Sequence, residues 1–163
     1  MIRPMDDREF LRHTLATLAY RAGKTLRGAS LGLADYRLHP DAKPAVAILA
    51  HMGDLFDWAL SMAIGKPKWN NATPQSWDAE CVRFFAALKA FDDVLASDQP
   101  LSYETTRLFQ GPIADALTHT GQIAMIRKLH GEPVKGESYN LADIQIGRVG
   151  SDQAPPDPRY EFN

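Results

Sequence analysis

Four long stretches of this chain repeat apolar residues at steps of three and four, which is the spacing that places side chains on one face of an α-helix. They cover residues 5–27, 44–64, 76–97 and 110–131. No stretch shows the strict alternation of a half-buried strand. The pattern therefore predicts an all-α protein built as a four-helix bundle, in which each helix buries its apolar stripe against the others.

The helix ends are marked by residues with known preferences. Asp6 and Asp7 favour the start of the first helix, Ser76 is a good N-cap, and Pro112 suits a first helical turn. Glycines after the apolar stripes predict stops. The expected core stripes include Phe10, Leu11, Leu15, Leu18, Val46, Leu49, Leu55, Leu60, Val82, Phe85, Leu88, Phe91, Ile113, Ala116, Ile123, Ile126 and Leu129.

The chain changes character after Gly131. Residues 132–163 hold four prolines and several glycines, and only the segment NLADIQIGRV is apolar enough to dock. We interpret residues 1–131 as the bundle and residues 132–163 as an irregular C-terminal tail packed on it, within a single domain.

The charge composition argues against two classes of binding partner. The 163 residues carry a formal net charge of -2, and the lysines and arginines are spread along the chain, so neither nucleic acid nor a membrane is an expected partner. No apolar run is long enough to span a bilayer, and no signal peptide precedes the first helix. The single cysteine, Cys81, cannot form an intramolecular disulfide. We therefore expect it to be a buried thiol in a protein of the reduced cytoplasm.

The last helix carries a half-site for a metal ion. Asp115 and His119 are four residues apart and Gln122 follows three residues later, so all three share one helix face. His51, on the expected inner face of the second helix, is the candidate third ligand, and a carboxylate that is buried on its own would be costly. Separate hydrogen-bonded or surface roles remain the alternative, because spacing within helices does not establish convergence between them. We expect Asp54, three residues after His51, to be either solvated or a hydrogen-bond partner of that histidine.

Two segments resemble a known family. ILAHMGDLFDW in the second helix and DALTHTGQIAMIRKL in the last are similar to the DinB/YfiT-like superfamily of metalloenzymes, over roughly residues 5–131. His51 matches the family's histidine on helix two, His119 the second histidine on helix four, and Gly121–Gln122 the pair that follows it. Asp115 stands where the family usually has a histidine. The resemblance implies an up-down-down-up bundle, commonly a homodimer, that binds one divalent metal ion.

The donor set and the resemblance together predict a function. Two imidazoles and a carboxylate suit zinc, iron or nickel, and three protein ligands leave an open position, as catalytic sites do. Relatives include thiol-dependent S-transferases and a mycothiol-dependent isomerase, which implies a low-molecular-weight thiol and a small electrophilic substrate, with Gln122 and Trp58 as cofactor-binding residues. Metal-dependent hydrolysis is the alternative, and a non-catalytic dimeric bundle with a structural metal is another. Cys81 has no histidine within one helical turn, which argues against a nucleophilic thiol.

Overall fold

The computed structural model describes residues 4–163 and is mostly helical. Its helices are α1 (Asp7–Leu26), α2 (Ala45–Ala63), α3 (Trp77–Ala96), α4 (Thr105–Leu108) and α5 (Ala114–Leu129), with the π-helical segment Phe109–Ile113 between α4 and α5. Three short 3-10 turns (Leu31–Leu33, Tyr139–Leu141 and Pro158–Tyr160) and two strands, β1 (Gly136–Glu137) and β2 (Glu161–Phe162), complete it. The all-α prediction is confirmed, apart from this one small sheet.

The helix ends follow the predicted signals. Asp6 caps α1 by accepting from the backbone N–H of Glu9, whose side chain accepts from the Asp6 N–H in return. Ser76 caps α3 through the N–H of Ala79. Gly28 and Gly131 follow α1 and α5 with φ angles of 64° and 89°, a left-handed conformation that favours glycine at helix ends.

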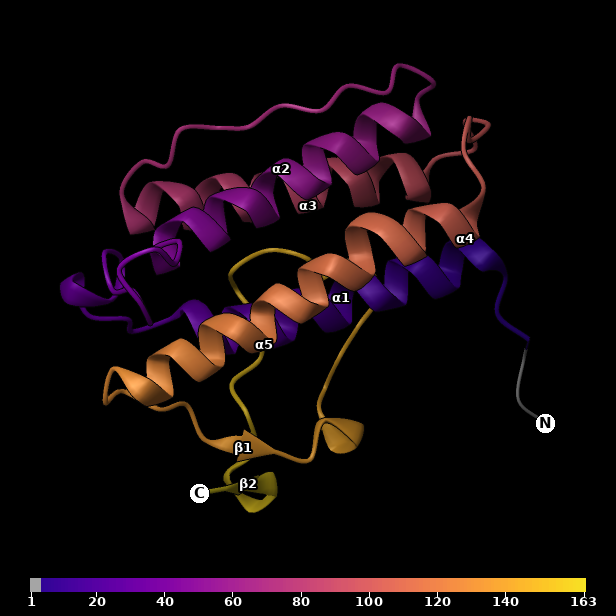
Figure 1. The fold of residues 1–163 in the computed structure, drawn as a ribbon. Helices are drawn as coiled ribbons and strands as arrows, with labels where there is room; N and C mark the ends of the chain where they lie inside the picture. The colour runs from indigo at the N-terminus through magenta and orange to yellow at the C-terminus, as the bar shows by residue number, and fades with distance from the viewer. Residues whose placement is uncertain (1–3) are drawn as a thin grey trace.

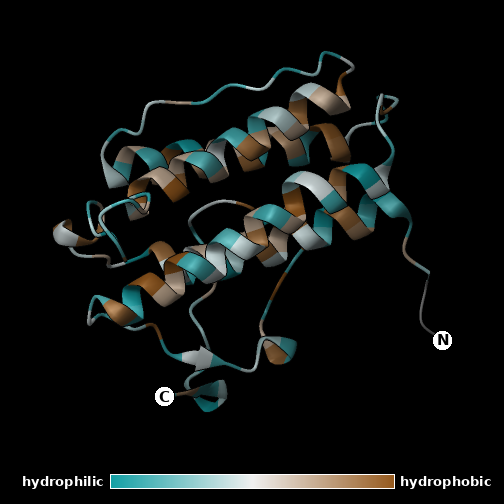
Figure 2. Cartoon of the chain, in the orientation of Figure 1, coloured by the Kyte–Doolittle hydropathy of each residue, from teal (hydrophilic) through white to brown (hydrophobic). Residues whose placement is uncertain are grey.

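The four long helices pack in pairs around a common core. Helix α1 packs against α3 and α5, and α2 packs against the same two helices, as Figure 1 shows. Hydrophobic residues recur along each long helix among hydrophilic ones (Figure 2). The largest side chains buried between the helices are Phe56, Phe84, Phe91, Leu11, Leu15, Leu18, Leu49, Met52, Leu88 and Leu95.

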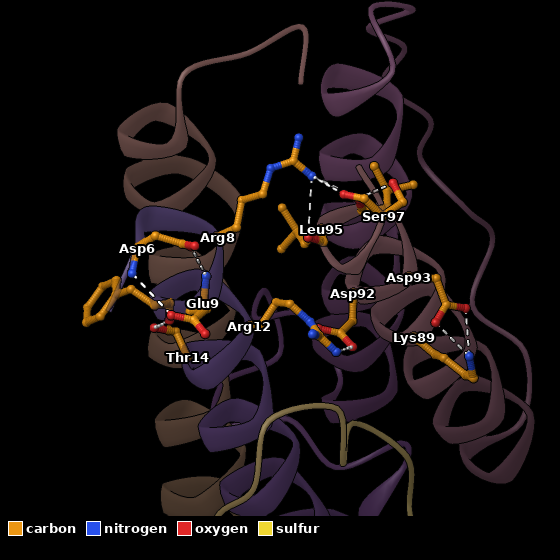
Figure 3. A network of polar contacts seen from close by, with 12 residues as sticks. Asp6, Arg8, Glu9, Arg12, Thr14, Lys89, Asp92, Asp93, Leu95 and Ser97 are labelled. Carbon is orange, nitrogen blue, oxygen red and sulfur yellow. Dashed lines mark hydrogen bonds and ion pairs between the residues drawn. The ribbon is translucent and has the colours of Figure 1, made fainter. Parts of the chain in front are cut away.

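Arginine side chains of α1 fix it to α3 (Figure 3). Arg12 forms two hydrogen bonds to the buried carboxylate of Asp92, at 2.9 and 3.1 Å. Arg8 donates to backbone carbonyls at the end of α3, including Ser97 O at 2.7 Å, where the last turn leaves acceptors without helical partners. These contacts hold the start of α1 against the end of α3 and supplement the apolar packing.

The C-terminal tail is held on α1 by a buried ion cluster. Strands β1 and β2 pair antiparallel, with Gly136 opposite Phe162 and Glu137 opposite Glu161. The Glu137 carboxylate accepts from Lys24 Nζ at 2.8 Å and from the Tyr20 hydroxyl at 2.6 Å, and Lys24 also reaches Glu161 at 2.9 Å. Within the NLADIQIGRV segment, Val149 is buried in the core, while Leu141 and Ile146 are exposed.

The last helical stretch begins earlier than predicted. Helix starts at Thr105 rather than near Gln110, so Pro112 lies inside it instead of in the first turn. Proline lacks the N–H for a normal helical bond, and here the backbone widens into a π-helix in which the Ala114 N–H reaches the Phe109 carbonyl. The proline is thereby accommodated without ending the helix.

Three predicted core residues are exposed. Val82 is 71% exposed, and Phe10 and Leu129 are also more exposed than buried. Phe10 packs against the Phe109 ring, with centroids 6.4 Å apart, yet remains 53% exposed. Periodicity gives the face of a helix but not how wide a face the neighbours cover.

Helix α2 has the length and apolar composition of a membrane span, and it alone does so among the helices of residues 4–163. This differs from the prediction that no apolar run is long enough to span a bilayer. In the structure 61% of that window is buried inside the protein. This burial is what the core helix of a helical protein requires.

Candidate metal site

Three of the predicted residues come together between α2 and α5. His51 on α2 and Asp115 and His119 on α5 each offer one ligand atom, and these atoms all lie within 4.8 Å of one another. The convergence across two helices is the feature that spacing within each helix could not establish.

The Asp115 carboxylate stands between the two imidazoles. Its Oδ2 is 3.3 Å from His51 Nε2, and its Oδ1 is 3.4 Å from His119 Nε2. The two rings are nearly perpendicular, with centroids 4.9 Å apart. Both histidines therefore present the same ring nitrogen, Nε2, toward the space beside the carboxylate.

Gln122 fixes which nitrogen of His119 is available. Its Oε1 lies 2.7 Å from His119 Nδ1, and an amide oxygen only accepts hydrogen bonds. With Nδ1 donating to this oxygen, the lone pair of a neutral His119 ring lies on Nε2, which faces Asp115. An outer partner that sets the tautomer in this way is typical of metal-bound histidines.

The site is shallower than predicted. The side chains of His51, Asp115 and His119 are 28%, 45% and 18% exposed, so none is fully buried. Asp115 is therefore less costly than the fully buried carboxylate considered from the sequence, and it lies against both histidines. The same exposure gives an incoming small molecule direct access to the ligand atoms.

Two tryptophans form a wall next to His51. The Trp69 ring, on the segment between α2 and α3, lies 5.5 Å from the His51 ring at 64°. Trp58 packs at 90° against Trp69, with centroids 5.7 Å apart. The predicted residue Trp58 therefore lies beside the site behind Trp69. Trp69 itself was missed, and the only signal for it is a large aromatic residue in an otherwise polar connection.

The Asp54 side chain is buried and has a structural partner, which corrects its expected role as a solvated residue or a partner of His51. One oxygen pairs with Arg83 at 3.0 Å, and the other accepts from the Ala72 backbone N–H at 3.1 Å. Arg83 also binds the buried Glu80 at 2.8 Å. This network fixes the connection that carries Trp69, three residues before Ala72.

Cys81 is a half-buried thiol on α3, a helix that contributes no residue to the His51–Asp115–His119 cluster. Burial, together with the negative charges of Asp78 and Glu80, raises its pKa to about 11. A thiol in this state is a weak nucleophile at neutral pH. The raised pKa is consistent with the prediction that Cys81 is not a nucleophile, although the thiol is half-buried and not fully buried as predicted.

Comparison of the chain with protein-family models, with curated proteins and with solved structures found no match. The geometry of the site is therefore the basis for assigning a function. Two imidazole nitrogens and a carboxylate oxygen, grouped at one accessible point, form a donor set that fits a divalent metal ion.

Proposed function

We propose that this protein is a metal-dependent enzyme that binds one divalent ion through His51, Asp115 and His119. The observation that carries the proposal is the convergence of three ligand atoms, from two helices, to within 4.8 Å. Three ligands with a solvent-accessible side are the arrangement of catalytic sites, whereas structural zinc sites are normally closed by four.

The local charges support a cation at this point. With the Nδ1 proton of His119 held by Gln122, a lone pair of the neutral ring faces a carboxylate oxygen at 3.4 Å. Two electron-rich atoms at that separation repel one another unless a positive charge lies beside them. A proton or a metal ion can supply that charge, and the nearby Nε2 of His51 makes the position a three-donor one.

The donor set admits zinc, nickel or iron. Two nitrogens and one carboxylate oxygen are a common catalytic zinc set and also resemble the facial arrangement favoured by ferrous iron. One carboxylate in place of a third histidine lowers the net charge of the loaded site by one. We expect a weaker Lewis acid than a three-histidine site would form.

The reaction we propose is transfer of a low-molecular-weight thiol to a small electrophile. A bound divalent ion would hold such a thiol as its thiolate, the nucleophilic form. The residues of this chain then have defined parts. Gln122 keeps His119 in its ligating tautomer, Asp115 contributes the accessible ligand atom, and Trp69 limits water on the His51 side.

Metal-dependent hydrolysis is the second candidate. Hydrolytic sites commonly add a carboxylate or imidazole as a general base. Asp54, which the sequence places close to His51, is instead committed to Arg83 and the Ala72 N–H. A thiol would release its proton to solvent on binding a divalent ion and so needs no such base, and a metal-bound water can do the same. The response of the cobalt-loaded protein to a thiol therefore distinguishes the two reactions.

The resemblance to the DinB/YfiT-like superfamily is part of the same proposal. Figure 1 shows α1 and α5 running in one direction and α2 and α3 in the opposite direction, and each of α1 and α2 packs against α3 and α5. This supports an up-down-down-up four-helix bundle within residues 1–131, with residues 132–163 packed on it. A cytoplasmic homodimer with a small-molecule substrate, and without nucleic acid or membrane as partner, completes the proposal. A non-catalytic bundle whose metal only stabilises the fold is the third reading.

Visible spectroscopy of the cobalt-loaded protein tests the transferase reading. Adding 2-mercaptoethanol should produce a sulfur-to-cobalt charge-transfer band, and ethanol at the same concentration should not. A Cys81→Ala variant should give the same band, which excludes the protein's own thiol. A cobalt spectrum that does not change with the thiol contradicts thiol transfer and favours hydrolysis or a structural metal.

A further inference from the structure

A cleft with its own lining lies on the far side of Asp115 from the histidines. It has a volume of about 400 Å³ and is bounded by Leu55, Trp58, Gln110, Gly111, Ala114, Asp115 and Thr118. That volume is within the range of small-molecule sites, although this cleft is open to solvent over much of its area. Asp115 belongs both to the cleft and to the metal-ligand cluster.

Trp58 and the π-helical segment give the cleft its shape. Gly111 lies in that segment, and a Cβ there would stand 3.7 Å from the Trp58 ring, in ordinary contact. The missing side chain therefore leaves the six-membered edge of Trp58 open to an occupant. Leu55 is buried behind the tryptophan and completes an apolar surface. Widened helical turns of this kind occur frequently at functional sites.

The charges on the cleft select against anions. Its polar lining consists of the neutral side chains of Gln110 and Thr118 and one carboxylate, Asp115, with no lysine, arginine or histidine. An anionic ligand would meet no positive partner among these groups. In the metal-free protein it would also meet the charge of Asp115, and in the loaded protein the formal charges of a divalent ion, Asp115 and a bound thiolate would cancel. A flat, uncharged molecule can stack on Trp58 and meet the Gln110 amide at the mouth.

We infer that this cleft is the binding site for the electrophilic substrate, and that this substrate is an uncharged small molecule with a planar or aromatic part. The inference rests on the proposed function for its chemistry, because a molecule stacked on Trp58 would have its reactive end beside Asp115. Binding in the cleft requires only the residues that line it, so it can be measured separately from metal loading.

Binding of three aromatic probes to metal-stripped protein tests the inference. 4-Nitrobenzyl alcohol is the uncharged probe, 4-nitrobenzoate the anion, and benzyl alcohol a smaller uncharged ring; saturation-transfer NMR and tryptophan quenching give the dissociation constants. We expect the two alcohols to bind saturably and the anion to bind about tenfold more weakly or not at all. Equal binding of 4-nitrobenzoate, or no saturable binding of either alcohol, overturns the inference.

Substitutions of cleft residues test whether the probe binds in the cleft. Trp58→Ala should weaken 4-nitrobenzyl alcohol binding about tenfold, near the upper limit for an aromatic pair. Gly111→Met should do the same by filling the cleft, and because methionine favours helix it guards against a loss that merely reflects unfolding. Met125→Ala removes an exposed apolar side chain of α5 outside the cleft and should leave binding unchanged. Wild-type affinity in both cleft variants contradicts the assignment.

Metal content separates this inference from the proposed function. His119→Ala should lose the metal ion yet bind 4-nitrobenzyl alcohol like the parent, since His119 does not line the cleft. A parent protein that binds the probe but no metal would refute the proposed function alone. A parent protein that binds metal but not the probe would refute the cleft alone.

Discussion

The Nδ1 atom of His119 lies 2.7 Å from the Oε1 atom of Gln122, one turn further along α5. This contact sets the tautomer of the imidazole and turns its other nitrogen to Asp115. The three-residue spacing of His119 and Gln122 therefore determines which imidazole nitrogen faces Asp115. In the proposed metal site, Gln122 would act through His119 and would not itself need to touch an ion.

Replacing Gln122 should therefore weaken the metal site without removing a ligand. In Gln122→Ala the His119 ring is free to turn and to carry its proton on Nε2, and we expect metal affinity to fall by about 10- to 100-fold. Titration with zinc in the presence of a competing chelator measures the change. Gln75→Ala, in an exposed position before α3, is the matched control. Unchanged affinity in Gln122→Ala would mean that the hydrogen bond has no part in metal binding.

The Asp54–Arg83 pair should stabilise both the fold and the position of Trp69. Asp54→Ala leaves Arg83 without one partner and frees the Ala72 N–H, and breaking a buried pair costs about 3–5 kcal/mol of unfolding free energy. Because the Arg83 side chain is 22% exposed, we expect a loss near the lower end. Urea unfolding measures it, and Trp69 fluorescence should shift to the red as the connection loosens.

The exposed pair between Lys89 and Asp93 is the control for that substitution (Figure 3). Surface pairs of this kind contribute about 0–1 kcal/mol, so Asp93→Ala should change little. A similar loss in both variants would contradict the account of Asp54 as the anchor of the segment that carries Trp69.

Lys24 should hold the C-terminal tail on α1. Burial opposes its charge, yet hydrogen bonds to Glu137 and Glu161 outweigh burial and raise the pKa of Lys24. A raised lysine pKa adds stability that is fully present below the ordinary value of about 10.5 and is lost as pH rises above it. In Lys24→Met, proteases should cleave residues 132–163 at neutral pH. In the parent protein, these residues should become cleavable only in strong alkali.

Limited proteolysis followed by mass spectrometry measures this release, with Lys128→Met, in an exposed position of α5, as control. Equal resistance of the parent and Lys24→Met would show that the tail is held by its apolar contacts alone, chiefly Val149.

Cys81 should react slowly. With its pKa raised from 9.0 to about 11, the thiolate fraction at pH 8 is about 100-fold below that of an ordinary cysteine. Iodoacetamide labelling should be slower by a similar factor in the folded protein than in urea, and should accelerate as pH approaches 11. Equal labelling rates in the folded and unfolded chain would contradict the raised pKa of Cys81.

The helices were predictable because their signals are local. Apolar spacing, the Ser76 cap and the terminal glycines act within one helix, so the four long helices appear close to their expected positions. Pro112 misled the prediction because the same residue suits a first turn and a π-helical widening, and only the packing of neighbours decides between them. Val82 and Phe10 misled it because apolar spacing does not specify how much of a helix face its neighbours cover.

The site was partly predictable for the same reason. Asp115, His119 and Gln122 share one helix, so their common face follows from spacing. The contribution of His51 depends on how α2 lies against α5, which no local pattern specifies. Trp69 and the true partners of Asp54 depend on the path of the connection between α2 and α3, which lacks periodicity and so left no signal.

Metal stoichiometry of the purified protein tests the central claim most directly. Elemental analysis after incubation with zinc, nickel or iron and removal of free ions should find one ion per chain, and His51→Ala and His119→Ala should lose it. His39→Ala should retain it, because His39 lies 3.5 Å from Asp41 on the surface with no third donor within the described residues. Absence of bound metal in the parent, or full retention in His119→Ala, would contradict the account.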